Sequence, residues 1–194
     1  MSAAEGGVVG ARRRRGGHLG RALLLALMLA AGAGTAAAQS GNPVIAGTAS
    51  VIDASHLEIA GHRFKLYGID APDADEVCQS AQGKDYPCGI EARDALVSLI
   101  GNAAVSCTPR GPDQNNAMMA VCAAGERDLG RAMVEAGWAI ADRTRTLVYE
   151  ETELKARTAK RGIWQGPFVP PAAWRLGERV PQNHKGSGAL QGIF

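Results

Sequence analysis

The chain has 194 residues, a length that favours one domain, and a formal net charge of +2. Five basic residues and one acidic residue precede Gln39, so the remainder carries 16 basic and 18 acidic side chains and a net charge of −2. This balance excludes the overall basic excess typical of proteins that grip a phosphate backbone. Nucleic acid stays possible as a partner only through a local basic patch.

Residues 1–38 predict a signal peptide. Arg12–Arg15 supply a basic n-region, Ala22–Ala31 an apolar h-region, and Ala36–Ala38 an A-x-A cleavage site before Gln39. The apolar run is shorter than the roughly 20 residues of a membrane span. We therefore expect an exported bacterial protein, periplasmic or secreted, with no span after cleavage. An uncleaved anchor is the alternative.

The rest of the chain predicts an α+β domain at residues 47–174, after a short lead-in at residues 39–46. The expected elements, in chain order, are strands Ile45–Asp53, His56–Ala60 and Arg63–Ile69, helix Ile90–Ile100, strands Ala104–Thr108 and Met118–Ala123, a helix capped by Asp128 and ended by Gly137, and helix Leu147–Arg161. This order is compatible with a five-stranded antiparallel OB-type barrel with three helices, without selecting it over other α+β arrangements. Residues 175–194 are expected to form a flexible C-terminal tail.

The four cysteines predict two disulfides, because an even number in an exported chain is typical of cross-links. Cys78–Cys88 would close a loop and Cys107–Cys122 would join two adjacent strands, so this pairing is preferred among the three possible connectivities. Zinc held by thiolates is the alternative, although the chain has neither a C-x-x-C pair nor closely spaced histidines.

The stretch from Val51 to Asp73, VIDASHLEIAGHRFKLYGIDAPD, resembles a motif of the staphylococcal nuclease (thermonuclease) family. Its end is similar to that family's R-x-R-L-x-G-I-D-A-P-E. Later matches to the family pattern are Tyr86–Gly89, Val121–Cys122, Asp128–Leu129, Met133–Val134, Gly137–Ala139 and Gly162–Trp164. The resemblance covers nearly the whole domain and implies the OB-fold barrel.

The resemblance also implies a chemistry, because this family hydrolyses phosphodiester bonds with calcium. Two Asp residues and a backbone carbonyl hold the ion, which prefers hard oxygen ligands. The second metal Asp is retained as Asp70, followed by Ala71 with its carbonyl. The first falls on Ser55, a neutral residue, and the next family position, a Thr, falls on His56.

The remaining catalytic positions are also altered. The first phosphate-binding Arg falls on Lys65, which keeps the charge and loses the bidentate fork. The catalytic Glu falls on Asp73, one methylene shorter, and the second Arg is replaced by Ala117. Arg110, on the same loop as Ala117, is a candidate replacement for that Arg.

These departures predict a pseudoenzyme that serves as a binding or accessory module of the cell envelope. We expect it to need no cofactor, to be a monomer and to act with an envelope partner whose identity the sequence does not give. The alternative is an impaired Ca²⁺-dependent nuclease acting on DNA or RNA through Lys65, Asp70 and Asp73. His56 as a base or ligand is a weaker reading than a polar residue at a strand start. Three tryptophans are expected to pack in the core rather than to stack on bases, namely Trp138, Trp164 and Trp174.

Overall fold

A computed structural model describes residues 43–112 and 117–180, all within a single unit that spans residues 40–194. The expected signal peptide, residues 39–42 of the expected lead-in and residues 181–194 of the expected tail lie outside the described residues. In the described part, no helix has the length and apolar character needed to cross a membrane.

The main sheet is a barrel that one bent strand closes. The expected first strand is present as two pieces, β1 (Ile45–Gly47) and β2 (Ala49–Val51). These pieces form the two ends of the strand order β1-β8-β9-β4-β3-β2. The other members are β3 (His56–Ile59), β4 (His62–Leu66), β8 (Val105–Pro112) and β9 (Met118–Ala124), with the short β10 (Arg127–Asp128) beside β9. Counted with the bent strand as one, five strands form the core of the barrel, so the α+β, OB-like fold is confirmed.

The sheet differs from the expected one in its pairing. Strands β3 and β4 form the expected antiparallel hairpin, whose turn residues Ala60 and Gly61 both have positive φ (50° and 79°). Strands β4 and β9 run parallel. A parallel pair requires a long crossover connection, and here the chain passes through a helix and β8 between these two strands.

The expected strand Arg63–Ile69 is broken in two. Strand β4 ends at Leu66, Gly68 adopts a left-handed conformation (φ 78°), and β5 (Ile69–Asp70) pairs with β11 (Ile140–Ala141) in a separate two-stranded sheet. The glycine makes this bend possible, because side chains disfavour positive φ. The bend carries Asp70 out of the barrel.

A second small sheet lies in the region expected to be a loop, Pro72–Pro87. There β6 (Cys78–Gln79) pairs with β7 (Asp85–Tyr86). Strands of two residues are too short to show an alternating pattern, so the sequence gives no signal for them.

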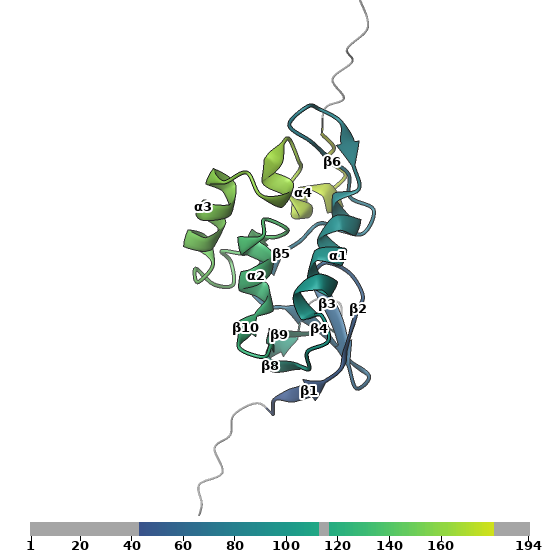
Figure 1. Ribbon diagram of the computed structural model, residues 1–194, viewed down its shortest axis with the longest axis vertical. Helices are drawn as coiled ribbons and strands as arrows, with labels where there is room; N and C mark the ends of the chain where they lie inside the picture. The colour runs from purple at the N-terminus through teal and green to yellow at the C-terminus, as the bar shows by residue number, and fades with distance from the viewer. Residues whose placement is uncertain (1–42, 113–116, 181–194) are drawn as a thin grey trace, which may run out of the picture. The chain divides into compact units, whose positions relative to one another are not determined.

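The described chain also contains helices. They are α1 (Cys88–Ile100), α2 (Leu129–Glu135), α3 (Glu150–Thr158), a 3-10 turn η1 (Gly162–Gln165) and α4 (Pro171–Arg175). Asp128 caps α2 as predicted, accepting a hydrogen bond from the Arg131 N–H at 3.0 Å. Helix α3 is shorter than expected at both ends, and α4 was not predicted. Figure 1 shows the barrel strands at one end of the molecule and α3 and α4 at the other.

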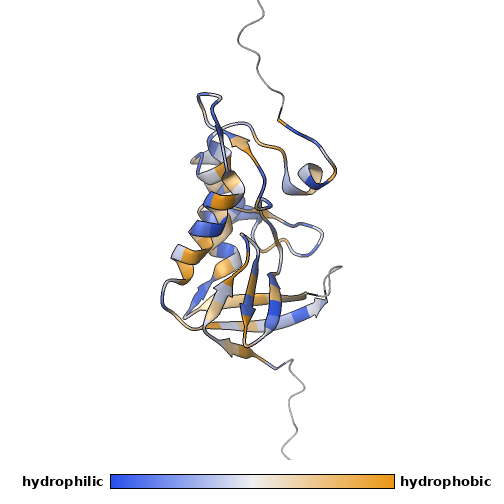
Figure 2. Ribbon diagram, turned by 90° about the vertical axis from the view of Figure 1, so that its right-hand side faces the viewer, coloured by the Kyte–Doolittle hydropathy of each residue, from blue (hydrophilic) through white to orange (hydrophobic). Residues whose placement is uncertain are grey.

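The core lies between the barrel and the helices. Leu57, Phe64 and Leu66 from the sheet are buried with Leu96 of α1 and Met133 of α2. Helix α1 carries both hydrophobic and hydrophilic residues (Figure 2), as expected for a helix that packs one face on a sheet. The tryptophans pack as expected: Trp138 and Trp164 are partly buried against apolar clusters, and Trp174 is buried.

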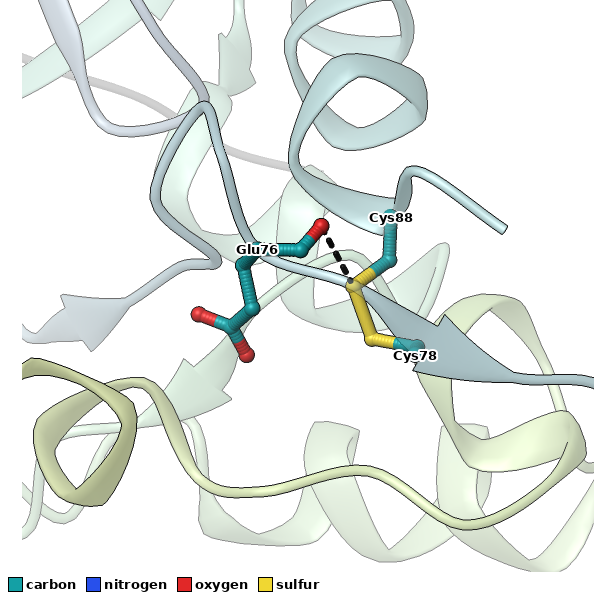
Figure 3. A group of neighbouring side chains, drawn as sticks. All are labelled: Glu76, Cys78 and Cys88. Atoms are coloured by element: carbon teal, nitrogen blue, oxygen red, sulfur yellow. Dashed lines mark hydrogen bonds between the residues drawn. A yellow bond between two sulfur atoms is a disulfide. The ribbon is translucent and has the colours of Figure 1, made fainter. Parts of the chain in front are cut away.

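Both predicted disulfides are present, Cys78–Cys88 and Cys107–Cys122. The second bridges the paired positions of β8 and β9 inside the core. Glu76 lies beside the first, and Figure 3 shows its backbone oxygen directed at the Cys88 sulfur, 3.4 Å away. Glu76, Cys78 and Cys88 form a compact set of possible metal ligands, but the disulfide leaves no thiolate to hold zinc.

Candidate functional site

A pocket of about 320 Å³ gathers most of the predicted site residues at the mouth of the barrel. Its lining consists of Ser55, His56, Lys65, Leu66, Gly68, Ile69, Asp73, Met119, Asp142, Arg145 and Arg175. Ala117 is buried just before β9, where the residue that replaces the second family Arg contributes only a methyl group. The pocket is thus built from β3, β4, β5, β9, the segment after β11 and α4.

The strongest contact at this pocket joins Arg175 to both retained carboxylates. Its Nη2 donates to the two oxygens of Asp70 at 2.7 and 2.8 Å, and its Nη1 donates to Asp73 at 3.0 Å. Partial burial lowers the pKa of Arg175, but the two carboxylates outweigh this effect and the pKa is raised. A planar guanidinium suits such a bridge, because its N–H groups form a fixed fork.

Ser55 is the residue that the resemblance aligns with a family metal ligand, and in the structure its hydroxyl is engaged in a turn. Its Oγ lies 3.2 Å from Asp53 Oδ1 and 3.1 Å from His56 Nδ1. The Asp53 carboxylate also accepts the N–H groups of Ser55 and His56, both at 2.8 Å. Burial raises the pKa of Asp53, and hydrogen bonds from His56 and Ser55 outweigh it, so the pKa falls to about 2. Asp53 therefore fixes the turn that leads into β3.

Calcium does not fit this donor set. Ca²⁺ takes six to eight oxygen ligands, usually with several carboxylates among them. Here both oxygens of Asp70 accept hydrogen bonds from Arg175, and the partner position is the neutral Ser55. A guanidinium held against these carboxylates repels a second cation, so we derive no catalytic step through a metal.

Two further cations line the pocket, Lys65 and Arg145. Lys65 pairs with His56 across the β3–β4 ladder, and its ammonium forms no ion pair with a carboxylate of the described chain. Arg145 forms a long ion pair with Asp142, with 3.9 Å between its Nε and the Asp142 Oδ2. The carbonyl of Arg145 accepts a hydrogen bond from the Tyr67 hydroxyl at 2.7 Å, which fixes the backbone that presents this side chain.

Arg110 lies elsewhere. It lines a separate hollow with Tyr67, Val148 and Tyr149, whereas Lys65 lines the pocket described above. The replacement of the second family Arg by Arg110 therefore remains without geometric support. Arg145, which the sequence analysis did not single out, occupies the pocket instead.

Glu76 is a buried carboxylate next to the site that sequence reasoning also missed. It is 1% exposed, its Oε2 accepts the Asp73 N–H at 3.2 Å, and its Oε1 is buried without a hydrogen-bond partner in the described part of the chain. Burial raises its pKa to about 7, and the Asp73 N–H offsets only part of that rise. Glu76 lies three residues after Asp73, and nothing in the surrounding sequence distinguishes it from an acidic residue at the surface. Its burial follows only from the tertiary packing.

The comparisons with known proteins agree with this architecture. The model of the staphylococcal nuclease homologue family matches residues 63–166. The succinoglycan biosynthesis protein ExoI of Rhizobium meliloti (strain 1021) is 33% identical over 159 residues, covering 80% of each chain. The matched region contains Lys65, Asp70, Asp73 and both disulfides. This chain belongs to the staphylococcal nuclease family.

Proposed function

We propose that this chain is an exported, non-hydrolysing member of its family, an accessory module that binds an anionic group of an envelope polysaccharide without calcium. The observation that carries the proposal is the bridge from Arg175 to Asp70 and Asp73. In this bridge Arg175 occupies both carboxylates, whereas a calcium-dependent nuclease needs them free to bind the ion. Two disulfides support export, because such bonds persist in oxidising compartments.

The pocket chemistry supports an anionic ligand. Arg175 neutralises Asp70 and Asp73 in part, and Asp142 pairs with Arg145 only at 3.9 Å, so Lys65 and Arg145 are the cations of the lining that can receive a ligand. Ammonium and guanidinium groups bind carboxylates and phosphates by charge-assisted hydrogen bonds. The pocket therefore offers cations to an anionic ligand, with Lys65 at one aligned phosphate-binding position and Arg145 from outside the family motif.

Three observations favour a polysaccharide over a nucleic acid. The chain from Gln39 onward has a net charge of −2, which disfavours the long run of phosphate contacts that a nucleic acid requires. The relative ExoI is named for succinoglycan biosynthesis. A pocket of about 320 Å³ suits a single charged group rather than a chain of them.

Isothermal titration of the purified protein with an acidic oligosaccharide, such as oligogalacturonate, in a chelator tests the proposal. Oligothymidylate of equal charge forms the second arm, and Lys65→Ala, Arg145→Ala and the distant Arg93→Ala are the variants. We expect oligosaccharide binding that weakens in the first two variants only. Tighter binding of oligothymidylate would favour a nucleic-acid ligand, and no binding of either would contradict the proposal.

An impaired nuclease is the second candidate, favoured by the presence of Lys65 and Asp73 in one pocket. It requires Arg175 to leave the carboxylates before a metal binds. Calcium-dependent cleavage of single-stranded DNA separates it from the accessory module.

A further inference from the structure

The last part of the described chain, residues 162–179, folds back toward the loop that the Cys78–Cys88 disulfide closes. We call this segment the strap. Its Ile163 is buried against Cys78 and Cys88, and the Pro167 carbonyl accepts the Gln79 N–H at 2.9 Å. A side chain on Gly166 would collide with the backbone of Gln79 and Ser80, so the two segments are in direct contact.

The strap contains the short helix α4, whose last residue is Arg175. Trp174 is only 8% exposed, and the Arg179 guanidinium lies 3.6 Å from the centre of its ring. Arg179 also donates to the Trp174 carbonyl at 3.0 Å. These contacts fix the helix so that the next side chain, Arg175, reaches Asp70 and Asp73, more than 100 residues earlier in the chain.

The hydrogen bonding between strap and loop is incomplete. Gln79 Oε1 of the loop and Trp164 Nε1 of the strap are buried and have no hydrogen-bond partner in the described part of the chain. Each such group disfavours packing of the strap on the loop, because it loses its hydrogen bonds to water and forms none in the protein. A covalent constraint on one side of the contact offsets this cost by restricting the open states of the loop.

We propose that the Cys78–Cys88 disulfide locks the strap in place and thereby keeps Arg175 on Asp70 and Asp73 as the built-in cation of that pair. The inference goes beyond the proposed function and does not depend on which ligand the pocket binds. The Arg175 guanidinium thus supplies the positive charge that a metal ion supplies in the family, and the disulfide stabilises its position.

Amide hydrogen exchange tests the lock. The variant Cys78→Ser/Cys88→Ser removes it, and Cys107→Ser/Cys122→Ser is the matched control within the barrel. The reporters are the strap amides of Trp174 and Gly177, which donate within the strap, compared with the barrel amide of Tyr67. We expect the first variant to raise strap exchange at least about tenfold more than barrel exchange, while the control does not.

Equal acceleration of strap and barrel amides in the first variant would overturn the lock. If that variant does not fold, Cys78→Ala/Cys88→Ala serves in its place, because it removes the disulfide without placing hydroxyl groups at two fully buried positions. Strap amides that exchange as slowly in Cys78→Ala/Cys88→Ala as in the wild type would equally contradict the proposal.

Calcium binding tests the built-in cation, with the metal alone as the probe. In a calorimetric titration we expect no binding to the wild type at millimolar Ca²⁺ and weak binding to Arg175→Ala that Asp70→Asn then removes. Equal binding by wild type and Arg175→Ala, or none by either, would show that Arg175 does not occupy a cation position. Neither result depends on whether a polysaccharide binds.

Discussion

The guanidinium of Arg175 holds both oxygens of Asp70, at 2.7 and 2.8 Å, across a separation of 105 residues. Asp70 is the residue that the family resemblance aligns with a metal-binding Asp. Its partner comes from the end of the domain, so the same contact closes the fold and fills the site.

This bridge should stabilise the fold modestly. In a double-mutant cycle with Arg175→Ala and Asp70→Asn, urea unfolding is expected to give a coupling of about 1 kcal/mol, because the pair is bidentate but partly exposed. Arg93→Ala and Asp94→Asn form the control cycle, since that pair is exposed on α1. A coupling no larger than in the control would mean that the bridge contributes nothing to folding.

Glu76 should make the protein more stable in mild acid. Its pKa is raised from 4.5 to about 7, so the folded state binds the proton more tightly than the unfolded state does. Stability is therefore highest below pH 4.5, as far as this group is concerned, and falls as pH rises through 7. Glu76→Gln cannot ionise and should raise the free energy of unfolding at pH 8 by about 1–3 kcal/mol.

The control for that measurement is the same pair of proteins at pH 4.5, where they should differ little. Denaturant titrations at both pH values give the two differences. An identical effect of Glu76→Gln at both would show that ionisation of Glu76 is not the cause.

Asp53 should have the opposite effect on the pH dependence of stability, because its ionised form stabilises the folded state. Its pKa is lowered from 3.8 to about 2, so its stabilising effect is present above pH 3.8 and is lost as the pH falls through 2. Asp53→Asn should cost about 1–2 kcal/mol at pH 7 and flatten the acid limb of the stability curve. Asp94→Asn, on the exposed side of α1, should leave that limb unchanged, and an unchanged limb in Asp53→Asn would contradict the role given to this turn.

Ligand affinity should depend weakly on salt. With Lys65 and Arg145 as the two binding cations, log K plotted against log salt concentration should have a slope near −1 to −2, by analogy with about 0.7 per phosphate contact on single strands. Lys65→Ala should reduce the slope by about 0.7. A slope several times steeper would indicate an extended polyanion-binding surface rather than one pocket.

Much of the barrel could be predicted from the sequence, because the hairpin at Ala60–Gly61 and the Asp128 cap leave local signals. The disulfide pairing followed from the predicted strands. The break at Gly68 was missed, since a glycine in a strand pattern does not by itself say where the chain turns. The parallel pairing of β4 with β9 depends on the crossover connection, which no local pattern shows.

The site was predictable only in part. Lys65 and Asp73 were placed from the family motif and do line one pocket, and Asp70 adjoins it through Arg175. Arg175 carries no motif and sits at the first residue of the expected tail. Its role arises from tertiary contacts of the strap, which residue spacing cannot reveal.

The most direct test of the central claim is the rate of single-stranded DNA cleavage by the purified protein, in calcium and in a chelator. We expect both rates to equal that of buffer alone, because Arg175 holds Asp70 and Asp73 and Ala117 offers no guanidinium to a phosphate. Robust cleavage that requires calcium and disappears in Asp73→Ala would contradict it.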